Sequence, residues 1–181
     1  TTSLNAPPRT PVDGPLAASL DVDLLGRVSA RVDGREIPIR GEIPRALLAR
    51  LALSAGAQVP GDVLVDDLWI SPPDTAAVSV RGNIAKLRAA GLAPFLRGGR
   101  GGYQLDVDSD RVDLLRLRRD VRALRSSIGR ADARTDPGAT DLEGVAALLW
   151  SGEAMPELDE QPFAIRTRAE LADERRVAGQ E

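Results

Sequence analysis

A stretch without acidic residues, from Thr75 to Gln104, constrains the fold of this chain more than any other feature. Its first part predicts a helix that is capped by Asp74 and ended by Gly91. Its second part holds two short apolar segments joined by five residues of the sequence GGRGG, which predicts a β-hairpin. The basic side chains of the stretch are Arg81, Lys86, Arg88, Arg97 and Arg100. A positive helix followed by a positive hairpin is what a winged helix presents to duplex DNA.

The residues before this stretch predict a small antiparallel sheet and two further helices. Asp33-Gly34 is a strong turn signal between two segments of alternating polarity. Pro44 suits the first turn of a helix, and Gly56 suits the position just after its end. The expected strands are Val22–Leu25, Val28–Val32, Glu36–Ile39, Phe95–Arg97 and Tyr103–Val107, and the expected helices are Pro44–Ala55, Gly61–Trp69 and Thr75–Ala90.

From Arg111 onward the pattern is helical only. We expect helices over Val112–Gly129, from the capping box Thr140-Asp141-Leu142-Glu143 to Trp150, and from Pro162 to Gln180. Their lengths are typical of tetratricopeptide-like helical hairpins, which usually need about three repeats. The natural protein is therefore expected to continue past Glu181. The chain also looks trimmed at Thr1, so we expect an upstream segment to be missing.

The predicted fold class is α+β, with three parts. Residues 1–20 are rich in Pro, Ser and Thr and are expected to form a flexible arm. Residues 21–108 are expected to form a winged-helix domain with an N-terminal sheet and a C-terminal hairpin wing. Residues 109–181 are expected to form the first helices of an all-α domain, cut short.

The residue types that are missing exclude several chemistries. The chain has no cysteine and no histidine, so disulfides, the usual zinc or iron–sulfur ligands, a Cys nucleophile and a His base are absent. Asp66 and Asp67 would support acid–base catalysis only in a shielded cleft, and on a short amphipathic helix we expect them to be exposed. We therefore expect no enzyme activity, no metal and no cofactor.

No run of about 18 apolar residues indicates a membrane span, and no signal peptide is visible. We expect a cytoplasmic, nucleoid-associated protein without a membrane partner.

For DNA binding, the distribution of charge along the chain matters more than the net charge. The net charge is −3, whereas many DNA-binding domains are basic. Residues 1–108 are neutral overall, residues 109–181 carry a net charge of −3, and Thr75–Gln104 alone carries +5. The modest net charge keeps a second interpretation open, in which a helical-repeat protein uses its winged domain to bind another protein and not DNA.

Five segments, in order, resemble one known family. GEIPRALLARLALSAGAQVPGDVLVDDLW, TAAVSVRGNIAKLR and FLRGGRGGYQLDVD resemble the OmpR-type winged helix of the Streptomyces antibiotic regulatory protein family. VDLLRLRRDVRAL and LWSGEAMPELDEQPFAIRTRAEL resemble the bacterial transcriptional activator domain that follows it. The resemblance implies an activator of secondary-metabolite (antibiotic) biosynthesis genes that binds promoter DNA at direct repeats, with homodimers on those repeats as one option. It also implies recruitment of RNA polymerase through its sigma and alpha subunits.

The resemblance also implies roles for residues of the third helix. A helical wheel predicts that Ala77, Val80, Ile84 and Leu87 face the core. Base-facing positions of the family fall on Arg81, Gly82 and Lys86, and phosphate-facing positions fall on Ser79 and Arg88. Asn83 is a further candidate, because asparagine pairs with adenine if the helix rolls slightly.

The wing departs from the family pattern. OmpR-type wings commonly end in Gly-Tyr-Arg, whereas this chain has Gly102-Tyr103-Gln104. Either the wing contact is weak or Arg100 at the tip replaces the missing arginine, and Arg97 is another candidate.

In relatives, the loop between the second and third helices contacts the polymerase. Asp66, Asp67 and Asp74 lie beside it here, and a plain solvated turn explains them equally well.

Overall fold

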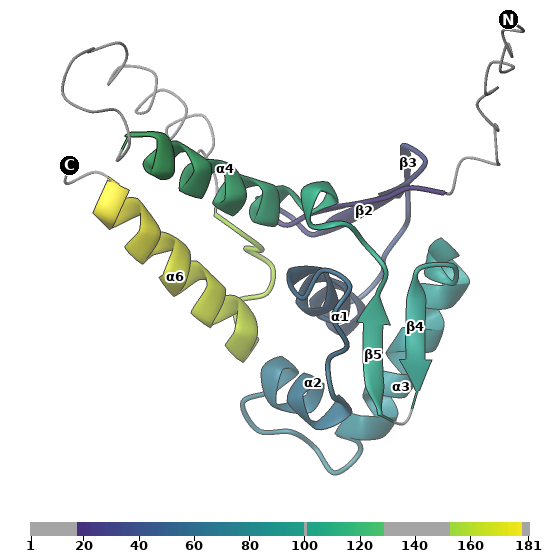
Figure 1. Cartoon of the computed structure of the whole chain (residues 1–181). Helices are drawn as coiled ribbons and strands as arrows, with labels where there is room; N and C mark the ends of the chain where they lie inside the picture. The colour runs from purple at the N-terminus through teal and green to yellow at the C-terminus, as the bar shows by residue number, and fades with distance from the viewer. Residues whose placement is uncertain (1–17, 100, 129–152, 179–181) are drawn as a thin grey trace, which may run out of the picture.

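The computed structural model describes residues 18–99, 101–128 and 153–178, and it has the predicted α+β order (Figure 1). A small sheet comes first, three helices and a hairpin follow, and two longer helices end the described chain. The elements are β1 Leu20–Asp23, β2 Ser29–Val32, β3 Arg35–Glu36, α1 Glu42–Leu53, α2 Gly61–Leu68, α3 Ala76–Leu87, β4 Leu96–Gly99, β5 Gly102–Leu105, α4 Asp113–Ile128 and α6 Pro162–Ala178.

The N-terminal sheet is antiparallel with strand order β1-β2-β3. The predicted turn is confirmed: Asp33 and Gly34 both have positive φ angles, 49° and 77°, as a tight hairpin of this kind requires. The third strand is shorter than expected. The Ile37 amide still donates to the Ala30 carbonyl, but Pro38 follows and has no N–H, so the ladder ends there.

Helices α1, α2 and α3 pack on one another behind the wing. Pro44 lies in the first turn of α1 as predicted, although the helix begins two residues earlier, at Glu42. Leu47, Leu48 and Leu51 are fully buried and form the centre of the core. The end of α3 differs from the expectation. The regular helix stops at Leu87 and a wider turn, Arg88–Leu92, follows, in which Gly91 has a φ angle of 124°.

The hairpin β4–β5 is held by backbone contacts with the segment before α2. The amide and carbonyl of Val59 exchange two hydrogen bonds with Tyr103, at 2.8 and 2.9 Å. A Cβ atom at Gly102 would lie 2.3 Å from the Val59 carbonyl oxygen. Gly102 is therefore required by a close approach of two backbone segments.

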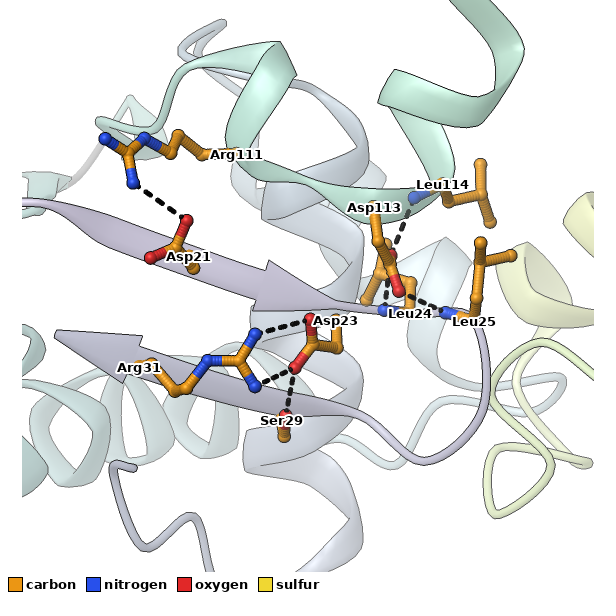
Figure 2. Close-up of polar contacts among 9 residues, drawn as sticks. All are labelled: Asp21, Asp23, Leu24, Leu25, Ser29, Arg31, Arg111, Asp113 and Leu114. Atoms are coloured by element: carbon orange, nitrogen blue, oxygen red, sulfur yellow. Dashed lines mark hydrogen bonds and ion pairs between the residues drawn. The ribbon is translucent and has the colours of Figure 1, made fainter. Parts of the chain in front are cut away.

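The start of α4 is bonded to the end of β1 (Figure 2). The Asp113 carboxylate accepts hydrogen bonds from the amides of Leu24 at 2.7 Å and Leu25 at 3.0 Å, and from that of Leu114 at the helix start. Burial is the largest influence on this carboxyl and raises its pKa, while the three amide bonds act in the opposite direction. Arg111 adds an ion pair with Asp21 at 3.1 Å.

The segment before α6 reaches the same sheet. The Met155 amide donates to the carbonyls of Leu24 and Gly26, and the Glu157 side chain accepts from the Val28 amide at 2.8 Å. Helices α4 and α6 lie side by side, and Arg118 of α4 bonds to Glu170 of α6 at 2.9 Å (Figure 1). One apolar core includes Leu47 of α1, Leu114 of α4 and Phe163 of α6.

The predicted helix over residues 140–150 lies outside the described residues, as does most of the predicted arm. The division into residues 21–108 and 109–181 stays a prediction. Within the described ranges, no helix has both the length and the apolar character needed to cross a membrane.

Candidate nucleic-acid interface

One face of α3 is buried against the helices behind it. Ala76, Val80, Ile84 and Leu87 are each at most 3% exposed. The expectation that Ala77 faces the core is wrong, since Ala77 is exposed and Ala76 takes its place. At about 100° per residue, Ala76 lies closer than Ala77 to the centre of this face.

The opposite face of α3 carries free positive charge. Arg81, Gly82 and Lys86 are exposed there, as expected from the sequence. Among the described residues, the ion pairs of the molecule include neither Arg81 nor Lys86. A Cβ atom added at Gly82 would meet no atom within 4 Å, so the fold itself does not require glycine at this position. The face is open, and α4 and α6 lie on the other side of the molecule (Figure 1).

The structure corrects the expected position of Asn83. Its side chain is only 7% exposed and does not stand on the outer face. The amide nitrogen Nδ2 donates to the Ser79 carbonyl at 2.9 Å and to Ser79 Oγ at 3.2 Å. The amide oxygen Oδ1 accepts from Lys86 Nζ at 3.1 Å. In this conformation both donor and acceptor are occupied, which leaves no edge free to pair with adenine.

Arg88 joins α3 to the wing. Its guanidinium donates to the Leu96 carbonyl at 3.2 and 3.3 Å and to the Gly98 carbonyl at 3.2 Å. The side chain is half-buried, so a phosphate contact there would be shared with this structural role. The sequence expectation for Arg88 named only the phosphate. Because its acceptors are backbone carbonyls, residue types carry no signal for this contact.

The other wing candidates are less free than the sequence indicated. Arg97 is exposed and forms an ion pair with Asp106 at 2.6 Å. Gln104 lies opposite Arg97 in the hairpin and donates to the Gly56 carbonyl beyond the end of α1. Arg100 lies outside the described residues. Tyr103 is 6% exposed and packs in the core.

The acidic residues near the loop between α2 and α3 fall into two groups. Asp66 is exposed, as expected. Asp74 is also exposed, but the expectation that it caps α3 is wrong, because the N-cap is Thr75 and no side chain bonds there. The expectation of exposure is wrong for Asp67, which is 6% exposed and bonds to Arg50 of α1 at 2.5 Å and to Arg166 of α6. Arg166 is 99 residues away in the chain, so local sequence patterns do not reveal this pairing.

Comparison with known proteins shows several regulators of similar sequence. No family model matches the chain. It is 33% identical over 175 residues to the transcriptional regulator RedD of Streptomyces coelicolor, which covers 90% of this chain and 47% of RedD. It is 30% identical over 152 residues to the regulatory protein DnrI of Streptomyces peucetius, which covers 77% of this chain and 54% of DnrI. These relatives are regulators of the Streptomyces antibiotic regulatory protein family, so the resemblance to that family is confirmed.

A solved structure of similar fold supports this architecture. A solved structure of Mycobacterium tuberculosis EmbR in complex with a low affinity phosphopeptide superimposes with a TM-score of 0.68 and 24% identity. The match covers 90% of this chain and 44% of that one, and at this identity it shows the fold alone. The chain spans about half the length of RedD and DnrI. The predicted winged-helix fold is thus confirmed, while the DNA-contact roles of individual residues stay predictions.

Proposed function

We propose that this chain binds double-stranded DNA through α3 and the β4–β5 wing, as part of a transcriptional activator. The observation that carries the proposal is the pair of exposed cations, Arg81 and Lys86, on a helix whose back is buried. The relatives RedD and DnrI are named as regulators, the first of transcription, which supports the same role.

The charges of the outer face match what duplex DNA offers. Arginine and lysine donate to the O6 and N7 atoms of guanine, and a good contact gives about 1–3 kcal/mol of discrimination against other bases. Positive side chains beside the helix also neutralise phosphates and release counterions. The net charge of −3 does not oppose this arrangement, because the binding face is formed from the acid-free stretch Thr75–Gln104.

The experiment that tests the proposal is a gel-shift titration with a duplex from the promoter regions near the gene that encodes this chain. Arg81→Ala and Lys86→Ala should each weaken the specific complex by about 1–3 kcal/mol, with an unchanged thermal melt. Arg116→Ala is the matched control, because Arg116 is an exposed arginine on α4, away from this face. Parent-like shifts by both α3 variants would refute the assignment of the helix.

Salt separates this proposal from a winged domain that binds another protein. DNA binding through several phosphates weakens steeply as salt rises, with a slope of about −0.9 per phosphate in a double-logarithmic plot. A mainly apolar protein contact lacks this dependence. A flat salt response of the parent complex would favour the protein-binding function.

We extend the proposal to two copies bound at direct repeats upstream of secondary-metabolite promoters. It rests on the family and on RedD and DnrI as relatives. Footprinting tests it: two protected segments with the same orientation and a constant spacing are expected. A single protected half-site would argue against paired copies.

We also propose that the polymerase, through its sigma and alpha subunits, contacts the surface around the loop between α2 and α3. Asp66 and Asp74 are exposed there, and the apolar side chain of Ile70 is exposed beside them. Asp66→Ala combined with Asp74→Ala should reduce activated transcription in a purified system without weakening the gel shift. An unchanged transcript level would exclude this surface.

A further inference from the structure

We propose that Asn83 is a positioning residue that presents Lys86 to one base and so determines specificity at that base. The inference rests on the proposed function, because it assumes that the outer face of α3 contacts DNA. It assigns to Asn83 an indirect role: the side chain acts through Lys86 and does not touch the base itself.

The hydrogen bonds of Asn83 fix the orientation of its amide. Both N–H donors of Nδ2 are used by Ser79, through its carbonyl at 2.9 Å and its hydroxyl at 3.2 Å. A flipped amide would place Oδ1 against the Ser79 carbonyl and the NH₂ group against the Lys86 ammonium. Acceptor would face acceptor and donor would face donor, so only the observed orientation satisfies all the groups.

The fixed amide oxygen in turn holds Lys86. The lysine Nζ lies 3.1 Å from Asn83 Oδ1, although the rest of its side chain is exposed. An ammonium group has three N–H donors, and one of them points at Asn83. Two remain, which matches the O6 and N7 acceptors that guanine presents in the major groove.

This arrangement orders Lys86 before DNA arrives. A long lysine side chain normally loses much rotamer freedom when it binds, and a contact made in advance reduces that loss. Because Asn83 is 7% exposed and bonded within its own helix, its position does not depend on the DNA. We therefore expect Asn83 to influence discrimination between bases more than overall affinity.

The test compares Asn83→Leu with the parent on two duplexes, the footprinted site and a scrambled sequence of equal length. Leucine keeps a side chain of similar size in the buried position but removes the acceptor for Lys86. The ratio of specific to nonspecific affinity should fall by about fivefold or more, with little change on the scrambled duplex. The same comparison is made in the Lys86→Ala background, where Asn83→Leu should have no further effect.

Two results would overturn the inference. One is an equal loss of affinity on both duplexes, which indicates a merely structural role. The other is an undiminished effect of Asn83→Leu when Lys86 is already alanine. If Asn83→Leu lowers the melting temperature, Asn83→Ala replaces it, since alanine is the most favourable helix residue. Failure of the proposed function looks different, because the parent itself would then not distinguish the two duplexes.

Discussion

On α3, Arg81 and Lys86 extend from the exposed face without an acidic partner among the described residues. The junction is the region where the N-terminal sheet, α2, α4 and α6 meet. Side chains of the same kinds form ion pairs there, such as Arg111 with Asp21 and Arg118 with Glu170. The paired charges there join segments far apart in the chain. The unpaired charges on α3 contribute nothing of that kind to the fold. The difference teaches that cations gathered in a stretch without acidic residues, more than the net charge, indicate the face that we propose for DNA binding.

The largest expected effect is at the junction. Asp67→Ala removes a buried carboxylate and leaves Arg50, whose side chain is 19% exposed, without its partner. The free energy of unfolding should fall by about 3 kcal/mol in urea denaturation followed by circular dichroism. Asp66→Ala is the matched control on the same helix, and its effect should stay within about 0.5 kcal/mol. Equal effects of the two variants would show that the buried pairing does not hold α2 to α1 and α6.

The second effect concerns the β4–β5 wing, which belongs to the proposed binding region. The position of the wing depends on its packing against Val59. Gly102→Ala would place Cβ 2.3 Å from the Val59 carbonyl at a φ angle of 129°. We expect a loss of about 2 kcal/mol in stability and a weaker gel shift. Gly101→Ala is the control, because its nearest neighbour would be 3.6 Å away, on the Gln58 side chain. A parent-like Gly102→Ala protein would mean that the hairpin does not approach Val59 so closely.

Gly82→Ala tests whether the exposed face of α3 serves the fold or DNA binding. Nothing lies within 4 Å of the added methyl group, so the helix should gain about 1 kcal/mol of stability. If α3 presses closely on a base edge, the same change should weaken the specific complex. Thermal melts and gel shifts on one sample measure both quantities. A more stable protein with parent-like binding would show that DNA does not require the small residue.

The smallest effect is a dependence on pH at the junction, and its sign is the informative part. Burial raises the pKa of the Asp113 carboxyl, so the folded chain holds this proton more tightly than the unfolded chain. The contribution of this group to stability is therefore fully present below the pKa of the unfolded chain and is lost as pH rises through the raised value. Urea unfolding of the parent and of Asp113→Asn at pH 7 and pH 4 tests this. The free energy of unfolding of the parent, relative to that of Asp113→Asn, should increase when the pH falls from 7 to 4. A decrease would contradict the raised pKa.

Much of the fold was predictable because its signals are local. The Asp33-Gly34 turn, the helix containing Pro44 and the order from sheet to hairpin each depend on residues close together in the chain. The outward positions of Arg81, Gly82 and Lys86 were implied by the resemblance to the family, and all three are exposed. Errors came where a distant contact changed a local pattern, as when Arg50 and Arg166 paired with a buried Asp67. The early end of β3 is different, because Pro38 is a local signal that the prediction missed.

The sequence by itself determined the order of elements, the resemblance to a family of regulators and the stretch without acidic residues. Only the tertiary structure decided that Asp67 is buried, that Asn83 bonds to Ser79 and Lys86, and that Gln104 reaches Gly56. Helices and turns follow from the conformational preferences of neighbouring residues, whereas the partner of a polar side chain depends on which groups packing brings within hydrogen-bond distance. For Asp67 and Gln104 those groups lie on other elements, and for Asn83 they depend on how α3 is turned against the core.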